Sequence, residues 1–192
     1  GICYFGISYV SGKTIDCMLE KEGLFSENKA LSIVLAIAEA LEYAWNEEKI
    51  LHRDIKPANI IINNKGIPML FDMGISKSLN EEANLTMTGT VIGTPYYMSP
   101  EQALAEKDID FRTDIYSSGT TLYHMVTGTV PYNATTAMAI IMKHIREKLP
   151  HPQTRNAALS DTCTDLIETM MPKDKQATHH SWTTIKNHIK II

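Results

Sequence analysis

The stretch ILHRDIKPANIIINNKGIPMLFDMG, residues 50–74, sets acidic, basic and amide side chains among short β-branched runs. Its IIIN and IPMLF segments are apolar, and the NNKG between them has the composition of a tight turn, so the pattern predicts a small β-hairpin. A hairpin returns its two ends to one edge. We therefore expect Asp54, Asn59 and Asp72 to converge there, where a buried acid needs a cation or a proton to offset its desolvation. Oxygen ligands of this kind suit Mg²⁺, with phosphate oxygens completing its shell.

The composition of the 192 residues is that of one globular domain, with 44% hydrophobic and 21% charged residues. A formal net charge of −4 and the lack of basic clusters argue against a nucleic-acid or anionic-membrane binder. Cys3, Cys17 and Cys163 are widely spaced, which favours reduced thiols over a disulfide framework or a zinc site. No apolar run is long enough to span a membrane and no signal peptide is evident, so we expect a cytoplasmic location, with any membrane anchor elsewhere in a parent protein.

Helical periodicity dominates the rest of the chain. Ser26 can cap a helix over about residues 27–48, whose apolar positions recur at steps of three and four. The stretch 72–101 has no periodicity, and its length is typical of a functional loop, with disorder as the alternative. Five helical segments follow it, near residues 101–106, 113–128, 135–147, 160–171 and 181–190. The sequence thus predicts a mainly α fold with one small hairpin.

Four motifs in register resemble those of eukaryotic-type serine/threonine protein kinases of the bacterial kind. HRDIKPAN is similar to their catalytic loop, and DMG, which begins 18 residues after Asp54, is similar to their DFG motif. GTPYYMSPEQ resembles the end of the activation segment with its A-P-E motif, and RTDIYSSGTTLYHMVTGTVPY resembles the long buried helix of the large lobe. The lysine after HRDI is typical of serine/threonine rather than tyrosine kinases.

The resemblance implies one domain over residues 1–192, the large C-terminal lobe of a kinase, with its hairpin at the cleft and without the N-terminal β-lobe. On this interpretation four parts of the chain are assigned: the last small-lobe strand and hinge (1–12), the catalytic loop and metal motif (50–74), the activation segment (72–101) and a helical subdomain (102–192). No glycine-rich loop, strand lysine or partner glutamate of the small lobe is recognisable in the sequence.

Phosphotransfer roles follow for the motif residues, as the resemblance implies. Asp54 would accept the proton of a substrate hydroxyl, Lys56 would stabilise charge at the γ-phosphate, and Thr94 would contact both of these side chains. Asn59 and Asp72 would hold Mg²⁺, or Mn²⁺, against the phosphates of ATP.

The resemblance also assigns residues around the nucleotide. The backbone of Ser8 and Val10 would meet the adenine of ATP, and Ile61 would line the same site.

Arg53 would pair with a phosphothreonine of the activation loop in a charge-assisted contact. The candidates for that phosphorylation are Thr86, Thr88 and Thr90.

Three residues are expected to have structural roles. Asp114 would bind the backbone of the H-R-D segment, and His52 would be a packed core histidine. Glu101 meets a buried arginine in the family, but that arginine position falls at Thr178, so we expect Glu101 to lack this partner. Met73 stands in place of the DFG phenylalanine, and we expect it to fill the same slot while changing the in/out preference of the loop. Ser99 stands in place of the A-P-E alanine, which we interpret as a minor change.

Two functions from different classes stay open. The first is a parent protein that phosphorylates Ser/Thr residues of protein substrates, of which this fragment alone is inactive. The second is a non-catalytic, pseudokinase-like scaffold or binding module. The expected partners are a protein substrate, the missing N-terminal lobe and, through an exposed apolar cleft face, a second copy of the chain.

Overall fold

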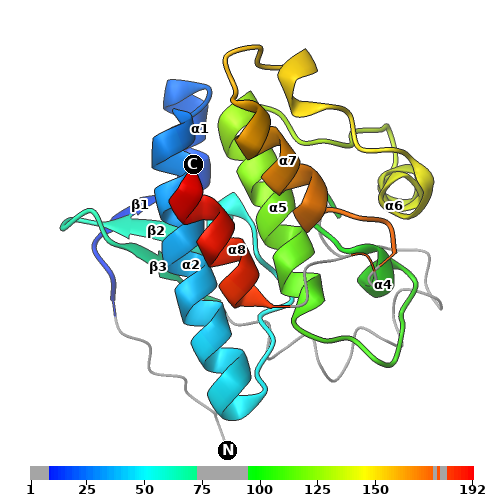
Figure 1. The fold of residues 1–192 in the computed structure, drawn as a ribbon, viewed down its shortest axis with the longest axis horizontal. Coiled ribbons are helices and arrows are strands. Elements are labelled where there is room, and N and C mark those ends of the chain that lie inside the picture. The colour runs from blue at the N-terminus through cyan, green and yellow to red at the C-terminus, as the bar shows by residue number, and fades with distance from the viewer. Residues whose placement is uncertain (1–8, 73–94, 175–176, 178–180) are drawn as a thin grey trace, which may run out of the picture.

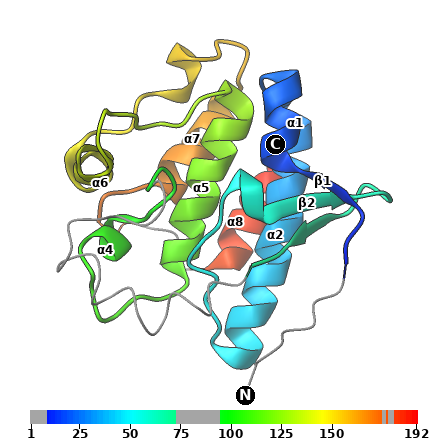
Figure 2. The ribbon, with the colours of Figure 1, turned by 180° about the vertical axis from the view of Figure 1, so that it is seen from behind.

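The structure is a computed structural model that describes residues 9–72, 95–174, 177 and 181–192. Two long helices, α2 (Glu27–Glu48) and α5 (Arg112–Thr127), run side by side through the centre, and a small sheet flanks α2 (Figure 1). Seen from behind, the same two helices separate the sheet from the α4 and α6 side of the molecule (Figure 2). The prediction of a mainly helical fold with one small sheet is confirmed.

The long helix predicted over residues 27–48 is α2. Ser26 caps it, because its hydroxyl accepts a hydrogen bond from the Lys29 N–H, and Lys49 ends it in a left-handed conformation with φ 55°. One face of α2 is buried, at steps of three and four residues, against the rest of the core. This spacing is the periodicity from which the sequence predicts the helix.

α5 is buried on nearly every side, as expected for the central helix of a bundle. Gly128, with φ 72°, ends it by donating to the carbonyl of His124. Gly119 lets α7 (Asp161–Met170) approach, since a Cβ at this position would lie 2.7 Å from Cβ of Met170. The helix that anchors the core therefore depends on a glycine for its closest packing contact.

The predicted hairpin consists of β2 (Ile60–Asn63) and β3 (Pro68–Leu70), paired antiparallel. Its turn is closed by Asn63, whose side-chain oxygen accepts from the N–H groups of Lys65 and Ile67. A third strand, β1 (Gly12–Thr14), pairs with the other edge of β2 and is followed by the helix α1 (Ile15–Glu22); neither is predicted from the sequence. A three-residue strand is too short to show a period, and α1 buries only Ile15 and Leu19, so the pattern was weak.

The five helices predicted after the long loop are all present. They are α4 (Pro100–Ala103), α5, α6 (Ala137–Arg146), α7 and α8 (Trp182–Ile191), and two 3₁₀ turns cover Pro57–Asn59 and Pro152–Thr154. Hydroxyls of Thr136, Ser160 and Ser181 cap α6, α7 and α8. Within the described ranges, no helix combines the length and apolarity needed to cross a bilayer.

Candidate active site

The loop between α2 and β2 is anchored to α5 by the side chain of Asp114. Its two carboxylate oxygens accept hydrogen bonds of 2.8 Å from the backbone N–H groups of His52 and Arg53. Asp114 is fully buried, and this burial raises its pKa to about 6, although the two N–H donors and the Arg53 charge act in the opposite direction. This is the contact with the H-R-D backbone that the family resemblance predicts.

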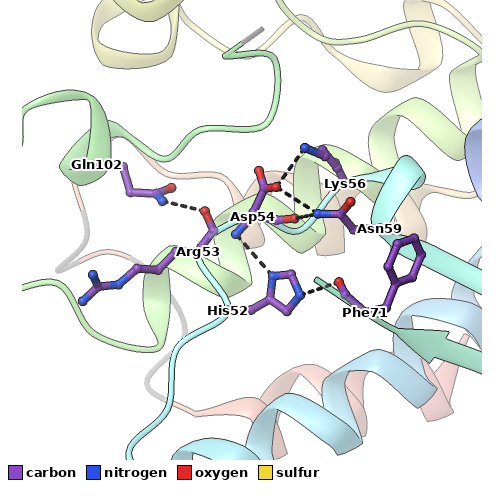
Figure 3. A network of polar contacts seen from close by, with 7 residues as sticks. All are labelled: His52, Arg53, Asp54, Lys56, Asn59, Phe71 and Gln102. Atoms are coloured by element: carbon purple, nitrogen blue, oxygen red, sulfur yellow. Dashed lines mark hydrogen bonds and ion pairs between the residues drawn. The ribbon is translucent and has the colours of Figure 1, made fainter. Parts of the chain in front are cut away.

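Arg53 is held in a strained conformation from both sides. Its φ of 63° is left-handed, which is unusual for a residue with a side chain. Asp114 binds its N–H, and Nε2 of Gln102 donates to its carbonyl at 2.9 Å (Figure 3). The strain is therefore balanced by hydrogen bonds from two different helices.

His52 joins this loop to the end of β3. Nδ1 accepts from the Asp54 N–H at 3.3 Å, and Nε2 lies 3.1 Å from the carbonyl of Phe71 (Figure 3). Because a carbonyl only accepts, this geometry fits a neutral ring with its proton on Nε2. His52 is buried, as expected, and it also fixes the distance between the loop and residue 71.

Asp54, Lys56 and Asn59 form one hydrogen-bonded cluster. Oδ2 of Asp54 accepts from Nζ of Lys56 at 2.8 Å and from Nδ2 of Asn59 at 2.9 Å. Asn59 Nδ2 also donates to the Asp54 carbonyl at 2.8 Å. Since Lys56 and Asn59 bind the same carboxylate oxygen, the orientation of the carboxylate is defined (Figure 3).

Asp72 lies directly beyond this cluster. The N–H of Phe71 donates to the Asn59 carbonyl at 3.1 Å, which continues the β2–β3 ladder and brings the next residue, Asp72, to the same edge. Asp72 is exposed and has a left-handed φ of 59°. The structure thus brings Asp54 and Asn59 together and places the backbone of Asp72 at the same end of the hairpin, while the convergence of the Asp72 carboxylate with them stays a prediction.

The oxygen donors at this edge fit a hard cation. The amide nitrogen of Asn59 faces Asp54, whereas its oxygen points away from Asp54 (Figure 3). The exposed Asp72 follows Phe71, whose N–H binds the Asn59 carbonyl. Among the described residues, no three His, Cys, Asp or Glu side chains gather at one point. Two such oxygen ligands suit Mg²⁺, which keeps several waters and shares phosphate oxygens, better than a metal that needs a full protein cage.

A link between α4 and the loop was not predicted. Ser99 caps α4 through a capping box, in which its hydroxyl accepts from the Gln102 N–H and the Gln102 side chain accepts from the Ser99 N–H. The Ser99 hydroxyl also bonds Thr113 at 2.6 Å, and Gln102 reaches the Arg53 carbonyl. The S-x-x-Q pattern was a signal for this cap, and Ser99 has a larger role than the minor one expected.

Comparison with known proteins identifies the family. The family described as Protein kinase domain matches residues 2–189 of this chain. The chain belongs to the protein kinase family. A probable serine/threonine-protein kinase of Clostridium perfringens is 39% identical over 173 residues, which cover 90% of this kinase chain and 25% of the relative.

Two further relatives are also named serine/threonine-protein kinases. A probable serine/threonine-protein kinase of Clostridium acetobutylicum is 42% identical over 153 residues, covering 80% of this kinase chain and 23% of that protein. The probable serine/threonine-protein kinase PknB of Bifidobacterium longum is 34% identical over 187 residues, which cover 97% of this kinase chain and 27% of that protein. The kinase chain therefore spans about a quarter of the length of these curated relatives. Its helical fold is that of the large lobe of a eukaryotic-type serine/threonine kinase.

Two of the predicted nucleotide-binding residues lie in or next to the sheet of this kinase chain. Val10 precedes β1 by two residues, and Ile61 lies in β2, paired with Thr14 of β1 and Met69 of β3. Both side chains are half-buried. Their contact with adenine stays a prediction.

The expectation that Glu101 of this kinase lacks the family arginine stays a prediction, because the position of that arginine, Thr178, lies outside the described residues. Glu101 is buried, and its charge acts on Arg112, whose pKa is raised first by a hydrogen bond to Asp110 and further by the carboxylates of Asp110 and Glu101. Arg112 binds Asp110 through Nε at 2.9 Å and through a terminal nitrogen at 2.6 Å. The fold therefore places a different cation, Arg112 at the start of α5, where the Glu101 charge acts on it.

Several residues that carried predictions lie outside the described part of this kinase, and their roles stay predictions. They are Ser8, Met73, Thr86, Thr88, Thr90, Thr94 and Thr178.

Proposed function

We propose that the protein containing this chain transfers the γ-phosphate of ATP to Ser or Thr hydroxyls of protein substrates. The observation that carries the proposal is the Asp54 carboxylate, oriented by Lys56 and Asn59 at the sheet edge where Asp72 emerges. Relatives at 34–42% identity that are named serine/threonine-protein kinases support it.

In the proposed reaction, Asp54 is the general base. The substrate hydroxyl oxygen attacks the γ-phosphorus, the bond from that phosphorus to the bridging oxygen of ADP breaks, and the hydroxyl proton passes to Asp54. The Lys56 ammonium, 2.8 Å from the Asp54 carboxylate, supplies positive charge next to the group being transferred. Asn59 keeps the base in its orientation by donating to the same oxygen.

Cofactor binding is proposed for the residues around this cluster. Asn59 and Asp72 would hold Mg²⁺, or Mn²⁺, which when bound neutralises charge on the ATP phosphates. The backbone of Ser8 and Val10 together with Ile61 would bind the adenine. Asn59 therefore has two separate functions, with its nitrogen toward Asp54 and its oxygen toward the cation.

Regulation is proposed to act through Arg53. A phosphothreonine at Thr86, Thr88 or Thr90 would pair with the Arg53 guanidinium and order the activation segment. The strained backbone of Arg53, fixed by Asp114 and Gln102, supports this role because it sets the direction in which the side chain leaves the loop.

The 192 residues alone are expected to show little phosphotransfer. A kinase cleft also needs a glycine-rich loop and a strand lysine over the phosphates, and neither motif is found in this sequence. The proposed partner for the cleft face is therefore an N-terminal kinase lobe. A cytoplasmic location of this domain remains part of the proposal.

The test is a phosphotransfer assay on the full-length protein with a Ser/Thr peptide. We expect Asp54→Asn to lower kcat by about 100-fold or more, because the base is lost while the amide keeps the side-chain shape. Asp165→Asn, an exposed carboxylate on α7, is the matched control and is expected to leave kcat unchanged.

If the wild-type full-length protein binds ATP and Mg²⁺ but transfers no phosphate, the kinase proposal fails. The pseudokinase-like scaffold then becomes the function that the fold supports. Ordinary turnover from the 192 residues alone would instead refute only the expectation that this piece is inactive.

A further inference from the structure

A second buried polar cluster lies at the contact between α6 and α4, away from the Asp54 cluster. It contains His144 of α6, Tyr116 of α5, Tyr132 and Lys173. His144 and Tyr132 have no exposed surface, and Tyr116 is 2% exposed. Buried polar groups in this number require a full set of hydrogen bonds, and the cluster provides them.

The ring of His144 has a defined protonation state. Its Nε2 lies 3.0 Å from the carbonyl of Tyr96, and its Nδ1 lies 3.0 Å from the hydroxyl of Tyr116. Since the carbonyl only accepts, Nε2 carries the proton and the Tyr116 hydroxyl donates to Nδ1. Burial, together with the charge of Lys173, lowers the pKa of His144 to about 3, so the ring is neutral at physiological pH.

Lys173 fixes the end of α6. Its ammonium donates to the carbonyl of His144 at 2.8 Å, to the carbonyl of Lys143 at 3.3 Å and to the hydroxyl of Tyr132 at 2.7 Å. These carbonyls belong to the last turn of α6, where a helix has too few intrahelical donors. The Tyr132 hydroxyl in turn donates to the Glu147 carbonyl at 3.0 Å. Lys173 thereby fixes the position of His144 next to Tyr116 of α5.

The segment that His144 binds leads directly to the catalytic loop. Beyond the Tyr96 carbonyl, the Tyr97 carbonyl accepts from the Ser117 hydroxyl at 2.8 Å, and the Tyr97 hydroxyl lies 2.7 Å from Nδ1 of His124. The capping box of α4 follows, and its Gln102 binds the Arg53 carbonyl. α4 and α6 pack against each other, so the line of contacts runs from α6 to the residue beside Asp54 (Figure 1).

We propose that His144 and Lys173 are positioning residues that hold the backbone of residues 96–98 in the conformation that receives the protein substrate. The inference rests on the proposed kinase function and adds residues of α6 and of the segment after α7 to it. A polypeptide extends about 3.3 Å per residue on each side of its reacting hydroxyl, so it needs an ordered surface beyond the Asp54 cluster. Residues 96 and 97 are partly exposed and tied to Arg53 through α4, which suits them to this contact.

The expected effect is on peptide binding rather than on the chemical step. His144→Ala removes the donor to the Tyr96 carbonyl, and we expect it to raise KM for a protein or peptide substrate about tenfold. kcat and KM for ATP should stay within about twofold of wild type, because the Asp54 cluster is not touched. Lys173→Met should shift the peptide KM in the same direction, since it releases the end of α6.

Matched variants separate positioning from general destabilisation. His144→Gln keeps an N–H donor close to the position of Nε2 and is expected to restore most of the peptide KM. Thr127→Val removes another buried hydrogen bond of α5, from its hydroxyl to the Tyr123 carbonyl, and is expected to leave the peptide KM unchanged. Equal peptide KM values for wild type and His144→Ala in the full-length protein would overturn the proposal.

A readout on the 192-residue chain makes the inference independent of turnover. Amide hydrogen exchange at Tyr97 and Met98 should be about tenfold faster in His144→Ala than in wild type, and close to wild type in His144→Gln. Unchanged exchange would refute the positioning role. If the full-length wild type transfers no phosphate, the proposed function fails, whereas faster exchange in His144→Ala with rescue by Gln would still support the structural half of the inference.

Discussion

Two residues of the site have left-handed backbone conformations that are unfavourable unless the surrounding fold stabilises them. Arg53 and Asp72 have φ values of 63° and 59°, and a left-handed conformation costs a residue with a side chain about 1–2 kcal/mol. Both flank the cluster of Asp54 and Asn59, and for Arg53 the hydrogen bonds from Asp114 and Gln102 offset the strain. No sequence motif reports such a conformation, because it results from contacts with distant helices.

Lys173 gives a pH-dependent prediction at the scale of one residue. Burial lowers its pKa to about 8, while the nearby charge of Glu147 acts in the opposite direction; Tyr132, His144 and Lys143 are its other polar neighbours. Between pH 8 and 10.5 the unfolded chain binds more protons at this site than the folded chain, so the free energy of unfolding increases with pH.

We therefore expect the wild type to gain about 1–2 kcal/mol of unfolding free energy relative to Lys173→Met between pH 8 and 10. The gain is smaller than the full pKa shift implies, because the side chain is partly exposed. Urea denaturation of both proteins over this pH range measures the difference, and other titrating groups cancel between them. Parallel curves for the two proteins would contradict the lowered pKa of Lys173.

At the scale of elements, the sequence predicted those with a clear period and missed those that depend on distant contacts. α2, the β2–β3 hairpin and the helices after the loop have strong periodicity or caps, and all are present. β1 and α1 are short, and the place of β1 is set by pairing with β2 across about fifty residues of sequence. Gln102, His144 and Lys173 were missed for a similar reason, since each acts through partners far along the chain.

The α5–α7 contact gives a prediction for Gly119. Alanine raises helix propensity by about 1 kcal/mol, but its Cβ would lie 2.7 Å from Cβ of Met170 and 2.9 Å from Cγ of Met171. We expect Gly119→Ala to lower the free energy of unfolding by about 1–3 kcal/mol, because the overpacking exceeds the propensity gain. Urea denaturation measures the change, and Asn46→Ala on the exposed face of α2 is the control that is expected to be neutral or stabilising.

The α4 cap gives a second element-scale prediction. Ser99→Ala introduces the residue of the family A-P-E motif but removes the capping hydroxyl and its bond to Thr113, so we expect a loss of about 1–2 kcal/mol in unfolding free energy. Amide exchange at Gln102 should also become faster. Ser181→Ala removes the cap of α8 without touching the site, and it should leave exchange at Gln102 unchanged. A fully neutral Ser99→Ala would show that the cap has no energetic role.

At the scale of the whole molecule, the small sheet has an exposed apolar surface. Ile67, Met69 and Phe71 are between 39% and 52% exposed, and they lie on or beside β3 next to the proposed nucleotide site. The sequence predicts self-association through an exposed apolar cleft face, and the N-terminal residues expected in that face, Ile2, Tyr4 and Phe5, lie outside the described residues. β3 provides an observed apolar surface for the same prediction.

We expect the 192-residue chain to associate in a concentration-dependent manner. Met69→Lys places a charge in the exposed β3 surface and should reduce the mass measured by light scattering at high concentration. Met138→Lys is the matched control, since Met138 is 54% exposed and belongs to α6, which lies across α5 from the sheet (Figure 1), and it should not reduce the mass. A strictly monomeric wild type at high concentration would contradict the prediction.

Three contacts that were described separately originate in one turn of α5. Asp114 binds the catalytic loop, Tyr116 binds His144 and Ser117 binds the Tyr97 carbonyl, within four consecutive positions of that helix. We therefore expect an axial displacement of this single turn to disturb the proposed phosphotransfer and the proposed substrate contact together. Thermal inactivation of the two properties should follow one cooperative transition, because neither has a scaffold of its own.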